Sequence, residues 1–126
     1  AHPSIIKVIN TIKAPYNING MTQQLVSDSL RDEKFKNQMV EQTLVQKNLL
    51  AQNLENLAFV EKIFPSDANF LLVKFTDAKA VFKYLITERI IVRDRSSVRL
   101  CEDCLRISIG TAAENEKLLA VLRNYK

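Results

Sequence analysis

The sequence predicts an α+β fold in which helices cover one face of a small, mainly antiparallel sheet. From about residue 59 the local patterns follow the order strand, strand, helix, strand, strand, helix, which is typical of such a unit. The preceding residues instead place apolar side chains at helical spacing. The 126 residues are 47% hydrophobic and 25% charged, which suits a globular domain with its own core. We therefore expect one compact domain over residues 59–126, preceded by helices.

Two short helices are expected at the start of the chain. The first follows Pro3, which suits a first helical turn. Its apolar side chains recur at helical spacing: Ile5, Ile6, Ile9 and Ile12. Residues 14–20 contain Pro, Asn and Gly and break the pattern before a second helix over about residues 21–30, with Asn19 or Thr22 as its cap. Two small helices bury little by themselves, so residues 1–30 are predicted to belong to a larger body.

A long helix is expected over about residues 31–58, and Asp32 is suited to cap it. One predicted face contains Phe35, Met39, Leu50, Leu54 and Leu57, and Val40, Leu44 and Val45 fall outside it. The apolar arc is therefore wide. Either the helix packs on two sides within this chain or part of it meets a partner, and the pattern leaves both open.

The first half of the predicted sheet is a pair of β-favouring runs at residues 59–64 and 70–75, joined by the turn-rich segment 65–69. Asp77 can cap a helix over residues 78–88. Its predicted buried face consists of Ala80, Val81, Tyr84 and Leu85.

The second half repeats this order with different lengths. Residues 90–94 and 104–109 read as strands, and Thr111 can cap a terminal helix over residues 112–124. The side chains of that helix expected in the core are Leu118, Leu119 and Leu122.

Arginines are concentrated in one stretch. Five of the seven lie between residues 89 and 106: Arg89, Arg93, Arg95, Arg99 and Arg106. An arginine grips a carboxylate or phosphate with two parallel hydrogen bonds, which a lysine does not provide. Strand alternation separates Arg106 from the core face of its strand. If the strands of Arg93 and Arg106 are neighbours, both side chains converge on one anion.

The alternative is that these arginines are solvated or pair with Asp94, Glu102 and Asp103. For Arg95 and Arg99, in the polar connection, this alternative is preferred because exposed loop charges contribute little. For Arg106 a ligand is preferred, because an arginine within an apolar strand needs a partner for its charge.

Other classes of site are disfavoured. The net charge is +4, but basic and acidic residues alternate and there is no tryptophan platform, so nucleic-acid binding is not expected. No apolar run approaches the roughly 20 residues of a membrane span, and we expect a cytoplasmic protein. Cys101 and Cys104 form a single pair without a nearby histidine and are expected to be reduced thiols rather than a metal site. His2 is assigned no role.

Two motifs carry a family resemblance. IIVRDRS at residues 90–96 and LCEDCLRISIGTAAENEKLLAVLR at residues 100–123 closely resemble the carboxy-terminal end of the histidinol-phosphate aminotransferase family, a branch of the fold-type I pyridoxal-phosphate enzymes. Three earlier segments resemble the same family in order and spacing: VINTIKAPYNIN, VEKIFPSDANFLLVKF and AVFKYLITERIIVRD. The resemblance covers essentially the whole chain. It implies that residues 1–30 are a helical remnant of the large cofactor-binding domain, residues 31–58 an interdomain helix and residues 59–126 the small domain.

The resemblance also implies site residues. Arg93 and Arg106 match the two strand arginines that contact the substrate in this family, so both are expected to be substrate-binding. Tyr16 matches a family motif too, and is expected to pack between domains. No catalytic or metal-binding residue is assigned, because the family's Schiff-base lysine and cofactor-binding residues lie upstream of the part resembled here.

The implied activity is transfer of an amino group between glutamate and imidazole-acetol phosphate in histidine biosynthesis, with pyridoxal 5'-phosphate bound by the upstream part of a homodimeric enzyme. The chain itself is then expected to be an inactive carboxy-terminal fragment. Two alternatives remain: a related pyridoxal-phosphate enzyme, such as a threonine-phosphate decarboxylase or an aromatic aminotransferase, and a free-standing anion-binding or interaction module.

Overall fold

The computed structural model describes residues 2–13 and 18–125, and Tyr16 lies outside them. The chain divides into two compact units, residues 1–36 and residues 37–126. Each unit is described by itself.

The first unit contains helices α1, Pro3–Ile12, and α2, Gly20–Arg31, and neither has a buried residue. Asn19 caps α2, because its side chain accepts a hydrogen bond of 2.8 Å from the backbone N–H of Thr22. This settles which of the two candidate caps is used. His2 has a similar local role in α1, where its side chain accepts from the backbone N–H of Ser4.

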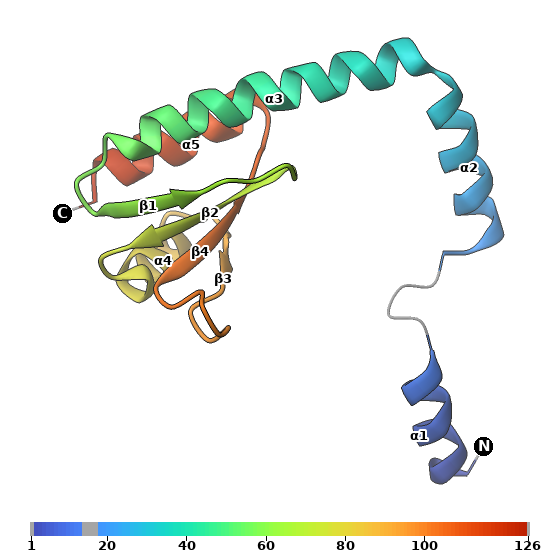
Figure 1. Ribbon diagram of the computed structural model, residues 1–126. Coiled ribbons are helices and arrows are strands. Elements are labelled where there is room, and N and C mark those ends of the chain that lie inside the picture. Colours follow the sequence, from blue (N-terminus) through green and yellow to red (C-terminus); the bar gives the residue numbers. More distant parts are fainter. Residues whose placement is uncertain (1, 14–17, 126) are drawn as a thin grey trace. The chain divides into compact units, whose positions relative to one another are not determined.

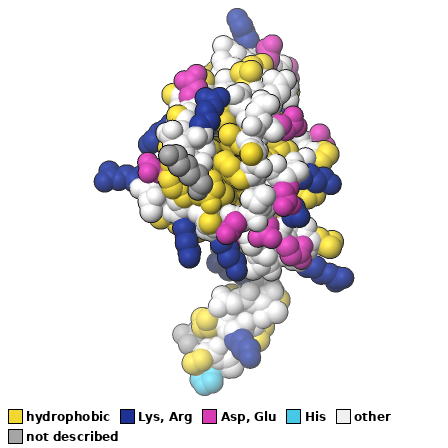
Figure 2. Space-filling model, turned by 90° about the vertical axis from the view of Figure 1, so that its left-hand side faces the viewer, with side chains coloured by type: hydrophobic (Ala, Val, Ile, Leu, Met, Phe, Trp, Pro, Cys, Tyr) yellow, Lys and Arg dark blue, Asp and Glu magenta, His cyan; other side chains and the backbone are white. Residues whose placement is uncertain are grey.

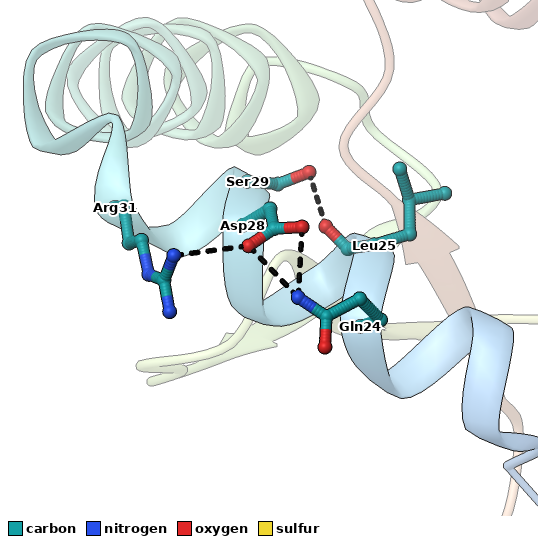
Figure 3. Close-up of polar contacts among 5 residues, drawn as sticks. All are labelled: Gln24, Leu25, Asp28, Ser29 and Arg31. Carbon is teal, nitrogen blue, oxygen red and sulfur yellow. Dashed lines mark hydrogen bonds and ion pairs between the residues drawn. The ribbon is translucent and has the colours of Figure 1, made fainter.

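Helix α2 is stabilised by contacts within its own turns (Figure 3). The carboxylate of Asp28 accepts hydrogen bonds of 3.1 and 3.0 Å from Gln24 and forms an ion pair of 3.2 Å with Arg31. The hydroxyl of Ser29 donates to the carbonyl of Leu25 at 2.8 Å. The side-chain contacts of Asp28 with Gln24 and Arg31, four and three residues apart, each contribute about 0.2–0.5 kcal/mol. Arg31 is thus an arginine whose charge is already paired locally.

Helix α3, Glu33–Glu55, begins after Asp32, whose side chain accepts from the backbone N–H of Phe35 at 3.0 Å. Its only buried side chains among the described residues are Leu50 and Leu54. Of the predicted apolar face, Leu50 and Leu54 pack within this chain, whereas Phe35 and Met39 are exposed. The sheet is short, so only the last turns of α3 pack against it. The apolar side chains that remain exposed on α3 are Phe35, Met39, Val40, Leu44, Val45 and Leu49.

The second unit is built on a four-stranded antiparallel sheet (Figure 1). The strands are β1, Val60–Phe64, β2, Phe70–Phe75, β3, Arg93–Asp94, and β4, Cys104–Ser108. Their order across the sheet is β1-β2-β4-β3, so the last strand in the chain lies inside the sheet between β2 and β3.

One face of the sheet carries the hydrophobic core. Its inward side chains are Leu71, Val73, Phe75, Leu105 and Ile107, all at most 3% exposed. They pack against the end of α3 and against helices α4, Ala78–Thr87, and α5, Ala112–Arg123. The helical contributions are Leu50, Leu54, Val81, Leu85, Leu118, Leu119 and Leu122. The prediction of an α+β fold with helices on one face of an antiparallel sheet is confirmed.

Strand β3 is shorter than the predicted strand over residues 90–94. The preceding helix ends with Arg89 in the left-handed region, at φ 59°, and the backbone N–H groups of Arg89 and Ile90 bond back to carbonyls of its last turn. Ile90 and Val92 then pack against the core, whereas Ile91 is 89% exposed. The backbone N–H groups of Arg89 and Ile90 are therefore already bonded to the end of the helix and are not available for a strand that begins at residue 90.

A capping box fixes the junction between β4 and α5. The backbone N–H of Thr111 donates to the carboxylate of Glu114 at 2.8 Å, and the backbone N–H of Glu114 donates to the hydroxyl of Thr111 at 3.4 Å. Gly110 is required beside it, because a Cβ atom there would lie 2.9 Å from the Cβ of Glu114. The buried side chain of Asn115 bonds to both the N–H and the carbonyl of Gly110.

This junction is expected to weaken in acid. The hydrogen bonds from Thr111 lower the pKa of Glu114 below its usual value of 4.5. A carboxylate whose pKa is lower in the folded state than in the unfolded state stabilises the fold at pH values above its unfolded-state pKa. That contribution is lost as the pH falls through the lowered value. The stability advantage of the wild type over Glu114→Gln, measured by urea unfolding, is therefore expected to be constant above about pH 5.5 and to shrink below about pH 4.5.

Glu116→Gln is the matched control, because it removes the same charge from α5 without touching Thr111. If the two variants lose stability with the same pH profile, the capping box is not the source of the acid sensitivity.

Candidate anion-binding site

The face of the sheet opposite the core carries the two predicted arginines. Arg93 of β3 and Arg106 of β4 are directly paired in the antiparallel register. Directly opposed residues project from the same face with Cβ atoms about 5 Å apart. Leu105 and Ile107, on either side of Arg106, are buried in the core, so Arg106 projects from the other face. The sequence-based condition that these strands are neighbours is therefore met.

None of the five arginines between residues 89 and 106 donates a side-chain hydrogen bond or forms an ion pair within residues 2–13 and 18–125. The other two arginines do: Arg31 pairs with Asp28, and Arg123 donates to the side chain of Asn53 at 2.8 Å. The clustered arginines thus have guanidinium donors to offer to a ligand.

The carboxylates considered as internal partners are engaged elsewhere. Asp94 accepts a hydrogen bond of 2.8 Å from the backbone N–H of Ser96, which lowers the pKa of Asp94. Glu102 accepts from the backbone N–H of Leu100 at 3.1 Å. Both carboxylates shape the connection between β3 and β4. In the described part of the chain, neither they nor Asp103 form an ion pair with Arg93 or Arg106.

Arg106 is half-buried, and its Nε atom is buried without a hydrogen-bond partner among the described residues. Its guanidinium carbon lies over the ring of Phe70, 5.1 Å from the centroid. A desolvated and unpaired donor is unfavourable by about 1–3 kcal/mol, so its presence calls for a partner outside these residues. Phe70 was not singled out from the sequence, because its place beside Arg106 depends on the register of β2 with β4.

An open hollow of ≈ 470 Å³ lies at this edge of the sheet and is lined by both arginines, Ser108 and Phe82. It combines two arginines, the carboxylate of Asp94, a hydroxyl and apolar walls. Asp94 accepts a hydrogen bond from the backbone N–H of Ser96, and the net charge of the lining is +1, which suits a small anionic molecule. A larger open hollow of ≈ 790 Å³ lies between α3 and the start of α5, but it is lined by Glu41 and Glu114 and by no cation. We favour the smaller hollow because its charge matches an anion.

The other arginines and the cysteines considered from the sequence do not line this hollow. Arg95 and Arg99 lie in the connection between β3 and β4, where Arg99 is exposed.

Cys101 and Cys104 are free thiols, and burial raises the pKa of Cys104, which keeps it protonated. On the face drawn in Figure 2, basic and acidic side chains are interspersed around hydrophobic ones rather than gathered in a basic stripe. Within the described ranges, no helix has both the length and the apolar character to cross a bilayer.

Helices on one face of a sheet and unpaired arginines on the other are typical of a domain that forms one wall of a ligand site, since such sites often lie between domains. The chain belongs to a family of this kind: the model of aminotransferase class I and II matches residues 1–122.

The curated relatives of the chain have a more specific name than that of the aminotransferase class I and II family. The chain is 44% identical over 125 residues to the histidinol-phosphate aminotransferase of Cytophaga hutchinsonii, and 44% identical over 126 residues to that of Parabacteroides distasonis. These alignments cover 99% and 100% of this chain and 36% of each relative. The chain therefore spans about a third of the length of the curated relatives that it matches.

Solved structures show the same fold. The histidinol-phosphate aminotransferase of Clostridium acetobutylicum matches 95% of this chain and 37% of its own with a TM-score of 0.77 at 21% identity. That of Sinorhizobium meliloti, in complex with pyridoxal-5'-phosphate, matches 96% and 35% with a TM-score of 0.73 at 19% identity. The L-threonine-O-3-phosphate decarboxylase of Porphyromonas gingivalis matches 98% and 39% with a TM-score of 0.62 at 22% identity.

Within residues 2–13 and 18–125, the side chains around this hollow do not make up a complete site for the cofactor that the family implies. No lysine lines the hollow beside Arg93 and Arg106. The two half-buried lysines of the described residues are engaged elsewhere, Lys47 with the carbonyl of Ser66 and Lys74 with the carboxylate of Glu61. Among the described residues, this hollow therefore presents arginine forks and no lysine amine.

Proposed function

We propose that this chain is the carboxy-terminal, substrate-anchoring part of a histidinol-phosphate aminotransferase. The observation that carries the proposal is the pairing of Arg93 with Arg106 on the uncovered face of the sheet, without an internal carboxylate partner in the described residues. The names of the curated relatives, at 44% identity over nearly the whole chain, supply the substrate class.

In this proposal residues 1–30 belong to the large domain, residues 31–58 form the interdomain helix and residues 59–126 form the small domain. The whole enzyme transfers an amino group between glutamate and imidazole-acetol phosphate. Both substrates are anionic, so arginine forks suit them. Arg106 grips one anionic group and Arg93 adds a second fork beside it, which orients the substrate for reaction. Pyridoxal 5'-phosphate, held by the rest of the enzyme, supplies the electron sink for amino transfer.

The whole enzyme is also proposed to be a cytoplasmic homodimer. Light scattering of the purified enzyme measures its mass directly, and a mass of one subunit would contradict the dimer.

Substrate use by the whole enzyme tests the proposed activity. We expect histidinol phosphate to donate its amino group to 2-oxoglutarate, with glutamate as the measured product. Threonine phosphate and aromatic amino acids are the comparison substrates. Release of CO₂ from threonine phosphate, or faster transfer from an aromatic amino acid than from histidinol phosphate, would replace the proposed activity with that of a related enzyme. The present chain alone is expected to show no transfer.

A further inference from the structure

The ring of Phe70 lies beside the guanidinium of Arg106, at 5.1 Å from ring centroid to Cζ. The sheet register explains the contact. Phe70 pairs with Ser108, two residues along β4 from Arg106 and on the same face. Diagonal neighbours of this kind lie within reach of long and aromatic side chains.

Packing in the hydrophobic core does not explain the presence of an aromatic side chain at Phe70. The core cluster and the partly buried hydrophobic side chains packed against it include Phe59, Phe75 and Phe82 but not Phe70. Phe70 is half-buried on the opposite face of the sheet. Its role therefore has to be found on the face where Arg106 lies.

Arg106 needs such a support. An arginine side chain has many rotamers, and a fork that meets an anion in two parallel bonds has to be held in one of them. Among the described residues Arg106 has no hydrogen bond to fix its orientation, and its Nε is buried without a partner. The face of an aromatic ring attracts a guanidinium and leaves its edge donors available to a ligand.

We propose that Phe70 is a positioning residue that holds the guanidinium of Arg106 in the orientation that receives the anionic group of the substrate. This inference rests on the proposed function, in which Arg106 anchors the substrate. Phe70 acts through Arg106, so its loss weakens substrate binding and leaves the later steps largely unchanged.

Kinetics of the whole enzyme test the role of Phe70. Phe70→Leu, which removes the ring but keeps an apolar side chain, is expected to raise KM for the anionic substrate about 5- to 30-fold while kcat changes little. Phe70→Tyr keeps the ring face and is expected to restore a KM close to that of the wild type.

Phe64→Leu is the matched control. Phe64 is also half-buried, and a cation, the Nζ atom of Lys62, lies 4.8 Å from its ring centroid. Strand β2 separates the strand of Phe64 from the strand of Arg106. The loss of Phe64 is expected to change KM by no more than about twofold. If Phe70→Leu and Phe64→Leu give the same KM, the positioning role is wrong.

A double-mutant cycle separates this inference from the proposed function. Phe70→Leu is expected to add little to the KM of Arg106→Lys, because the side chain that it positions has already lost its fork. Fully additive effects would overturn the positioning role while leaving Arg106 as the anchor. If Arg106→Lys by itself leaves KM and kcat unchanged, the proposed anchor fails and the inference fails with it.

Discussion

Arg106→Lys in the whole enzyme is expected to lower kcat/KM for the phosphorylated substrate by about 10²- to 10³-fold. The substitution keeps the positive charge but removes the planar fork, so two parallel charge-assisted bonds become one. The shorter lysine also loses the guanidinium face that lies over the ring of Phe70. Steady-state kinetics measure the change, and the absorbance of the bound cofactor is expected to stay close to that of the wild type.

Arg99→Lys provides the comparison for this prediction. Arg99 is an exposed arginine in the connection between β3 and β4, and its side chain makes no polar contact in the described residues. Its replacement is expected to leave kcat/KM within about twofold of the wild type. Unchanged kinetics of Arg106→Lys would remove Arg106 from the site, and an equal loss in both variants would indicate a general effect of charge.

Leu54→Ala is expected to lower the free energy of unfolding of the second unit by about 3 kcal/mol. Leu54 of α3 is fully buried in the core beside Leu50, so the truncation removes apolar contacts and leaves a cavity. Urea unfolding of the chain, followed by circular dichroism, measures the shift in midpoint.

Leu49→Ala removes the same atoms from the same helix, but Leu49 is 47% exposed. Its expected effect on the isolated chain is about 0.5 kcal/mol or less. Equal destabilisation by the two variants would contradict the assignment of a single packed side to the last turns of α3.

Local patterns predicted the elements of the second unit well. The strand over residues 70–75 and the caps Asp77 and Thr111 are as expected, because alternation and capping are set by near neighbours in the chain. The extent of packing was harder to predict. Phe35 and Met39 have helical spacing from Leu50 and Leu54, but spacing does not reveal where the sheet ends.

Part of the site was also predictable from near neighbours in the chain. Alternation within β4 separates Arg106 from its buried neighbours, and this reading needed no partner strand. The order β1-β2-β4-β3 joins segments far apart in the chain, so the partnership of Phe70 with Arg106 required the register. The substrate-binding role of Arg93 and Arg106 remains a prediction for the experiments above.

The direct pairing of Arg93 with Arg106 bears on the choice between singly and doubly charged ligands. Like charges opposite one another weaken a strand pair, so the β3–β4 edge carries an electrostatic repulsion before any ligand arrives. A monoanion bound at this edge leaves a net charge of +1 on the arginine pair. A phosphate dianion that bridges both guanidinium groups balances both charges, so its binding is strengthened by relief of the repulsion within the protein as well as by its own contacts. We therefore expect this edge of the sheet to discriminate by the valence of the ligand as well as by its shape.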